Sequence, residues 1–100
     1  MLEVIEEKEG TVLTIRPEGQ MNLTTSPAVA EKVTPERLDG ITKLIFDLTK
    51  LEYLSSAGIR VFLAASKAMS EGSEIVVTGA GAEILDILDM AGLSNIMTIE

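Results

Sequence analysis

The chain has 100 residues, 46% of them hydrophobic and only 3% aromatic, which is enough for one domain, residues 1–100, around an aliphatic core. It has no cysteine and no histidine, so disulfides, thiolate metal sites and the usual base for a serine nucleophile are excluded. The net charge of −8 argues against nucleic acid and anionic membranes as partners and favours a basic protein surface.

Residues 1–10 lack the basic start and the long apolar stretch of a secretory signal. The uninterrupted apolar runs are a few residues long, whereas a membrane helix needs roughly 20 residues. We therefore expect a cytoplasmic protein without a membrane segment, and the absence of cysteine is compatible with that compartment.

The chain opens with a predicted hairpin over residues 2–19. Apolar and polar side chains alternate on both sides of Gly10, which marks the turn. Pro17 and Gly19 are expected to end the second strand.

A first helix is predicted to follow the hairpin. Ser26 is a good N-cap, and Pro27 stands at the first helical position, where its missing N–H costs nothing. Pro35 disfavours helical geometry in the residue before it, so the helix is expected to kink or restart there. Gly40 then stops it.

The rest of the chain alternates strands and helices. The apolar run at 43–48 predicts a central strand buried on both faces. A helix over 57–72, a second buried strand over 74–79, an amphipathic helix over 82–93 and a short strand over 95–100 follow. Strand–helix–strand units require parallel neighbours with right-handed crossovers. The predicted fold class is therefore α/β, a mixed four- to five-stranded sheet with about three helices mainly on one face.

Function in such a sheet gathers at the carboxyl ends of the strands, where loops enter helix N-termini. Three loops qualify, at residues 19–26, 53–58 and 77–83. In the last of them, Gly79 and Gly81 are candidates for holding an anion or a nucleotide phosphate. The full dinucleotide fingerprint and the P-loop lysine are absent, so a tight turn that opens a helix is the better interpretation.

The second loop holds two adjacent hydroxyls. We predict Ser56 as the N-cap of the following helix and Ser55 as a turn residue or a second cap. A phosphate on Ser56 would lie at the positive end of the helix dipole, and Gly58 would leave its approach free of a Cβ. Taken from the residues alone, a structural cap is favoured over a phosphorylation site.

Asp47 ends the apolar run and is expected at the exposed end of its strand, solvated or hydrogen-bonded. No second carboxylate is placed for acid–base catalysis. We therefore predict no catalytic residue, no metal site and no cofactor, and we do not expect an enzyme.

The ordered set of these motifs resembles STAS domains, the family of bacterial anti-sigma factor antagonists. Residues 44–67 resemble the central segment of the family, with an apolar strand, Asp-Leu, a hydrophobic loop, paired hydroxyl residues, a glycine and an apolar helix. Residues 16–33 look like the family's first turn and helix, and residues 74–100 like its fourth strand, third helix and last strand. The resemblance covers nearly the whole chain, although no single motif is specific.

The resemblance implies a phosphoprotein that regulates transcription. Unphosphorylated members bind a partner anti-sigma factor, which is also a serine kinase, and free its sigma factor. By resemblance Ser56 takes the place of the phosphorylated serine. Ser55, the second candidate, and Asn22 both stand where the family usually has aspartate.

The partner-binding surface implied by the resemblance joins the first turn to the serine loop. It consists of Gln20, Met21, Asn22, Leu23, Ser55, Ser56, Ala57 and Gly58. The alternative function is a STAS-type regulatory module that binds a ligand or a nucleotide without phosphorylation, at Gly79 and Gly81 or at the serine loop.

Overall fold

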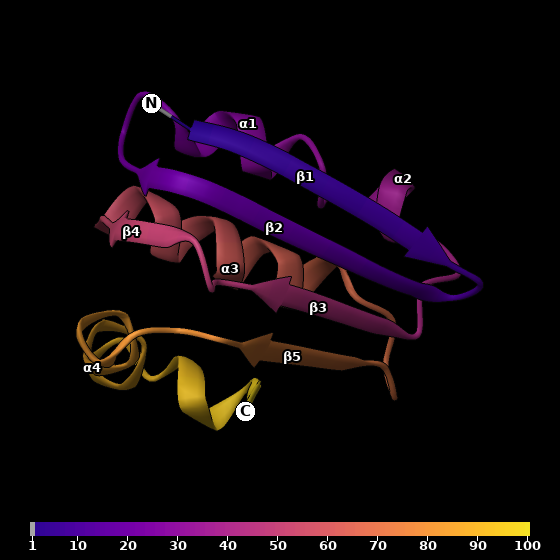
Figure 1. The fold of residues 1–100 in the computed structure, drawn as a ribbon. Coiled ribbons are helices and arrows are strands. Elements are labelled where there is room, and N and C mark those ends of the chain that lie inside the picture. The colour runs from indigo at the N-terminus through magenta and orange to yellow at the C-terminus, as the bar shows by residue number, and fades with distance from the viewer. Residues whose placement is uncertain (1) are drawn as a thin grey trace.

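The computed structural model describes residues 2–100 and contains a mixed sheet with helices packed on one of its faces (Figure 1). The elements in chain order are β1 Leu2–Glu9, β2 Val12–Met21, α1 Ser26–Ala30, α2 Pro35–Leu38, β3 Lys43–Asp47, β4 Leu51–Leu54, α3 Ser56–Ala68, β5 Glu74–Thr78, α4 Ala82–Met90, the 3-10 turn η1 Leu93–Asn95 and β6 Thr98–Ile99. The strand order is β1-β2-β3-β5-β6, and β4 pairs with β2 beside this path. Only the β1–β2 pair is antiparallel among the described strands.

The predicted fold class is confirmed, with differences in the counts. The sheet has six strands instead of four or five, because a short strand precedes α3. There are four α-helices instead of three, because the first predicted helix is divided in two. The predicted last strand, over 95–100, is shorter than expected: Asn95 ends the 3-10 helix η1, and only Thr98–Ile99 pair with β5.

The predicted hairpin is present, but its second strand is longer than expected. Gly10 makes the turn with a φ of 63°. Pro17 and Gly19 do not end β2, which continues to Met21. Pro17 lies between the stretches of β2 that pair with β3 and with β4, so its missing N–H interrupts neither ladder. Gly19, with a φ of 115°, lies where the register with β4 shifts, as glycine at a bulge does.

The first two helices show where local capping differs from the prediction. Thr25, and not Ser26, is the N-cap of α1, and Ser26 is the first residue inside the helix. The expected restart at Pro35 is confirmed, because Thr34 caps α2 by accepting a hydrogen bond from the Arg37 N–H. Within residues 2–100, no helix is both long and apolar enough to span a bilayer.

The apolar run at β3 is not buried on both faces, contrary to the prediction. Leu44 and Phe46 point into the core, whereas Lys43, Ile45 and Asp47 are half-buried on the opposite side. The physical reason is the one-sided helix layer: parallel strands that follow one another in a single direction, with right-handed crossovers, place their helices on the same face. An apolar run by itself does not reveal how many faces are covered.

The strand β4 was missed at the sequence level, where the family resemblance implies a hydrophobic loop. Leu51 and Leu54 are buried in the core, and residues 52 and 53 between them are exposed. Four residues carry too little periodicity to mark a strand. Pairing with the last residues of β2 makes this segment a strand.

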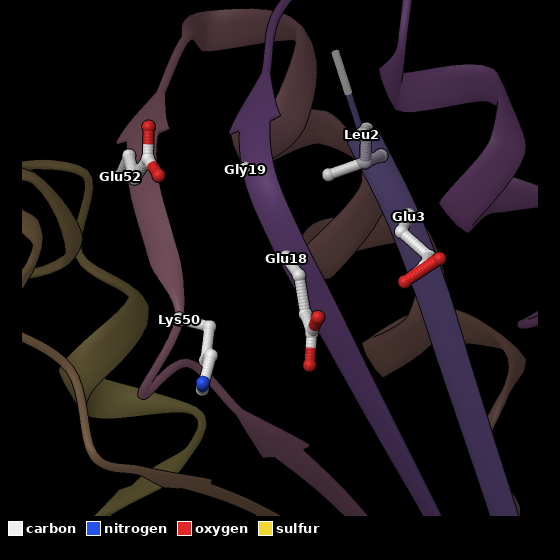
Figure 2. Close-up of a pocket in the computed structure, with 6 residues that line it drawn as sticks. All are labelled: Leu2, Glu3, Glu18, Gly19, Lys50 and Glu52. Atoms are coloured by element: carbon white, nitrogen blue, oxygen red, sulfur yellow. The ribbon is translucent and has the colours of Figure 1, made fainter.

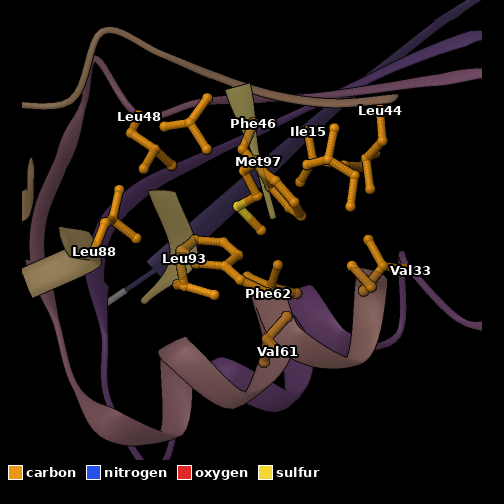
Figure 3. Packing of buried hydrophobic residues seen from close by; sticks show 14 of the residues in the cluster. Ile15, Val33, Leu44, Phe46, Leu48, Val61, Phe62, Leu88, Leu93 and Met97 are labelled. Carbon is orange, nitrogen blue, oxygen red and sulfur yellow. The ribbon is translucent and has the colours of Figure 1, made fainter. Parts of the chain in front are cut away.

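The core lies between the sheet and the helices, and α3 contributes its centre. Phe62 of α3 packs on Phe46 of β3 with ring centroids 4.6 Å apart and planes inclined by 55° (Figure 3). Both side chains are fully buried, and Val61 and Ala65 of α3 are buried beside them. This contact anchors the helix whose first turn carries the two serines.

Replacing Phe62 with alanine is expected to reduce the free energy of unfolding by about 3–5 kcal/mol, because it removes a buried ring and leaves a cavity. Lys67→Ala on the exposed side of the same helix is the control and should change it by no more than about 0.5 kcal/mol. Urea denaturation measures both. Equal losses in the two variants would contradict this account of the core.

Candidate functional site

The structure brings two of the three predicted loops together at one edge of the sheet. β2 and β4 run parallel, so their carboxyl ends lie side by side, and α1 and α3 begin just beyond them (Figure 1). The backbone N–H of Ser55 donates to the carbonyl of Met21 across this junction, at 2.9 Å. The first turn and the serine loop therefore form one surface, as the sequence predicts.

The two serines have different roles, and the predicted capping role falls on the other one. Ser55 is the N-cap of α3, and its Oγ accepts from the Gly58 N–H at 3.4 Å. Ser56 is the first residue inside the helix and is exposed to solvent. The prediction that Ser56 caps the helix is therefore wrong by one residue. Because Ser55 supplies the cap, the Ser56 hydroxyl is not used for it.

Gly58 serves packing, and not the approach of a phosphate. It is buried, and a Cβ built on it would lie 2.5 Å from Leu54 Cδ1 and 3.2 Å from Met21 Cβ. Carbon atoms do not approach this closely, so a larger residue would require the Leu54 side chain or the start of α3 to shift. The glycine thus sets how closely the helix start approaches the two strand ends.

Asn22 holds the first turn in shape. Its side-chain Oδ1 accepts from the N–H groups of Thr24 and Thr25, at 2.9 and 3.0 Å. The Thr25 hydroxyl in turn donates to the carbonyl of Gln20 at 2.6 Å. Asn22 therefore performs the turn-forming role for which an aspartate is equally suited, without adding a negative charge.

The predicted partner-binding residues divide into a buried and an accessible group. Met21 and Gly58 are buried, so they support the surface from beneath. Asn22, Ser55 and Ala57 are half-buried, and Gln20, Leu23 and Ser56 are exposed.

Sequence reasoning missed Tyr53, which lies between the buried leucines of β4. Its side chain is 50% exposed, and that of Leu23 on the neighbouring loop is 77% exposed. Tyr53 is registered opposite Gln20 of β2. Two large side chains with apolar surface therefore stand at the junction that carries Ser56. The signal that could have found Tyr53 was its place two residues before the serine pair.

The third predicted loop lies at the same edge of the sheet, after β5. Gly79 has a φ of 72°, and a Cβ on it would lie 2.3 Å from Thr49 Oγ1, so packing against the turn after β3 accounts for this glycine. Gly81 is the N-cap residue of α4, and the space beside it is open. The anion or nucleotide site at these glycines stays a prediction.

Asp47 stands at the end of β3, as predicted, and stabilises the turn that leads to β4. It accepts from the Thr49 hydroxyl and from the Thr49 N–H, the latter at 3.0 Å, and Arg16 Nη1 lies 3.7 Å away. The hydroxyl bond is the main reason that the pKa of Asp47 lies below its usual 3.8, with smaller contributions from the Thr49 N–H and Arg16. Among residues 2–100, no three potential ligand side chains cluster as a metal site.

Comparisons with known proteins agree with this geometry. The STAS domain model matches residues 4–100. An anti-sigma-B factor antagonist of Listeria monocytogenes is 29% identical over 97 residues, which cover 96% of this chain and 85% of that protein. An anti-sigma factor antagonist from Mycobacterium paratuberculosis has the same fold, with a TM-score of 0.88 at 19% identity over 99% of this chain and 85% of that one. The Bacillus cell fate determinant SpoIIAA, solved in its phosphorylated form, has a TM-score of 0.77 at 15% identity, over 98% and 91% of the two chains.

Replacing Thr49 with valine is expected to raise the pKa of Asp47 towards 3.8, because the main hydrogen bond to the carboxylate is lost. A lowered pKa means that the ionised group stabilises the fold above pH 3.8, and that this contribution is lost as the pH falls through the folded-state value. Thr49→Val should therefore be less stable than the parent at pH 7, and the difference should shrink in acid.

An NMR titration of the Asp47 carboxyl carbon measures the shift, and Thr24→Val, an exposed threonine of another loop, is the control. An Asp47 pKa that is the same in the parent and in Thr49→Val would contradict the proposed cause.

Proposed function

The chain belongs to the STAS domain family, and on this premise we propose that it is an anti-sigma factor antagonist switched by phosphorylation of Ser56. In the unmodified state it binds an anti-sigma factor serine kinase, which then releases its sigma factor. In the phosphorylated state it no longer binds. The observation that carries the proposal is the exposed Ser56 hydroxyl at the start of α3, which Ser55 leaves free by capping the helix.

The position suits a phosphate because the fold can accommodate its charge. The first turn of α3 reads Ser-Ala-Gly and carries no acidic side chain. A phosphate on Ser56 would add about −1.5 to −2 charges at the positive end of a helix of 13 residues. The dipole stabilises such a charge, so phosphorylation should leave the fold intact.

The surrounding surface suits a protein partner. Leu23 and Tyr53 offer exposed apolar area, and Gln20 offers an exposed amide next to them. A partner that covers these residues must also remove water from Ser56. Removing the hydration of a phosphate at that place costs several kcal/mol unless a cation of the partner pairs with it. Modification would thus weaken binding without any refolding of the domain.

The names of similar proteins support this role. The Listeria relative is an antagonist of an anti-sigma-B factor, and the Bacillus neighbour exists in a phosphorylated form. We favour this role over a ligand-binding module because packing against Thr49 already explains Gly79. Titration calorimetry with nucleotides distinguishes the antagonist from the ligand-binding module. The antagonist role predicts no heat of nucleotide binding.

The proposed function predicts that Ser56 is the residue that is phosphorylated. Incubation with ATP and the anti-sigma factor kinases of the same cell should place one phosphate on Ser56, located by mass spectrometry. Ser56→Ala should abolish labelling, keep partner binding and change stability by no more than about 0.5 kcal/mol, because this hydroxyl is not the cap. Ser56→Asp should fold normally and bind at least about tenfold more weakly.

Ser55→Ala is the matched control for this experiment. It should retain labelling on Ser56 but lose about 1 kcal/mol of stability, because it removes the cap of α3. Labelling that disappears with Ser55 and persists in Ser56→Ala would show that the wrong hydroxyl had been chosen. Full binding by Ser56→Asp would rule out the charge mechanism.

The proposed function also predicts that the exposed side chains of Tyr53 and Leu23 contact the partner. Tyr53→Ala and Leu23→Ala should each weaken binding to the kinase by about tenfold or more, since buried aromatic and aliphatic anchors dominate such interfaces. Met90→Ala, at the 87% exposed last residue of α4, is the matched control and should bind like the parent. Surface plasmon resonance gives the affinities, and equal effects at all three positions would contradict the proposed surface.

A further inference from the structure

The side of the sheet that faces away from the helices forms a second surface, here called the open sheet face. It consists of the side chains of β1, β2, β3 and β5 that alternate with the core residues of those strands. All helices of the described chain, residues 2–100, contribute to the core on the other side. The open sheet face does not contain Ser56, which lies at the start of α3.

An apolar row crosses the middle of this face. Thr14, Ile45 and Val76 are in register on three neighbouring strands, and Val76 is buried, with only 1% of its surface exposed. The β-branched side chains Ile45 and Val12 are only half-buried, although they lie on central strands. They help to line a hollow of about 760 Å³, whose other lining residues are Glu7, Lys8, Glu9 and Thr14. Partly exposed apolar side chains beside a hollow offer contact area to another molecule.

Carboxylates of four strands flank the apolar row. Six of them belong to the open sheet face, against the two cations Arg16 and Lys43: Glu3, Glu7, Glu9, Glu18, Asp47 and Glu74. The face is therefore acidic, like the chain as a whole.

Arg16 does not neutralise this charge. Its guanidinium lies 3.6 Å from carboxylate oxygens of Glu7 and Glu18 and 3.7 Å from one of Asp47. One positive charge therefore faces three negative ones. The Nε of Arg16 is shielded from water and has no hydrogen-bond partner within residues 2–100. The cluster keeps a net negative charge beside the apolar row.

A second hollow, of about 470 Å³, opens at the other end of the face (Figure 2). Glu3, Glu18 and Glu52 line it, together with Lys50, Leu2 and Gly19. Figure 2 shows the carboxylates of Glu3 and Glu18 standing on adjacent strands. The same combination of carboxylates and a little apolar surface thus occurs at both ends of the open sheet face.

We propose that the open sheet face is a second docking surface, for a basic amphipathic segment of a protein partner. Its lysines and arginines would reach the carboxylates, and its apolar side chains would cover the half-buried Ile45 and Val12. A second copy of this chain does not fit, because two faces with six carboxylates each repel one another. Nucleic acid and anionic lipid are excluded by the same repulsion.

The proposal extends beyond the switch at Ser56, since a partner docked here leaves α3 free. A synthetic amphipathic peptide of lysine and leucine serves as the probe, and a glutamate–leucine peptide of the same pattern as its control. Fluorescence anisotropy should show binding of the lysine peptide alone, and the affinity should fall as salt rises. NMR shift changes should map to the amides of β1, β2 and β3.

Matched variants locate the binding. Glu7→Lys with Glu9→Lys should weaken peptide binding by about tenfold or more, whereas Glu31→Lys with Asp86→Lys, an equal change of charge on the helix side, should weaken it less than about twofold. Ile45→Thr keeps a β-branched strand residue and should also weaken binding. Ser56→Asp should bind the peptide as the parent does, which separates this surface from the switch.

Equal weakening by the two double variants would overturn the proposal, because it would show binding to total charge alone. Shift changes confined to the helix side would overturn it as well. Thermal melts monitored by circular dichroism check that each variant is folded. Should Ile45→Thr fail to fold, the NMR map on the parent protein still decides the location.

Discussion

The close approach of α3 to β2 and β4 at Gly58 is the constraint on which the site depends. Because a Cβ there would lie 2.5 Å from Leu54 Cδ1 and 3.2 Å from Met21 Cβ, glycine allows the helix to start directly above the two strand ends without moving either side chain. The bond from the Ser55 N–H to the Met21 carbonyl then fixes the position of the helix start. Ser55 caps α3, and the next residue, Ser56, faces solvent at the positive end of the helix dipole.

The one-sided helix layer determines where the remaining surfaces lie. All crossovers run over the same face, so strands such as β3 bury Leu44 and Phe46 but leave Ile45 half-buried. The site at the strand ends and the open sheet face are therefore separate surfaces on one rigid sheet. A charge added at one of them need not change the other, and the two can serve different partners.

The proposed switch requires no second conformation. A phosphate on Ser56 would act locally, by its charge and by the cost of removing its water at a contact surface. The core contact between Phe62 and Phe46 holds α3 in place in both states. Under the proposed function, affinity would therefore change through the differential interaction with the partner alone, while the domain keeps its fold.

Features that local chemistry controls could be predicted from the sequence. The hairpin turn at Gly10, the new helix at Pro35 and a helix start within one residue of Ser56 all follow from backbone preferences of single residues. Only the tertiary structure decided that residues 51–54 form a strand, that one sheet face stays open and that Ser55 is the cap. These depend on pairing and packing with distant segments, which neither periodicity nor propensity encodes.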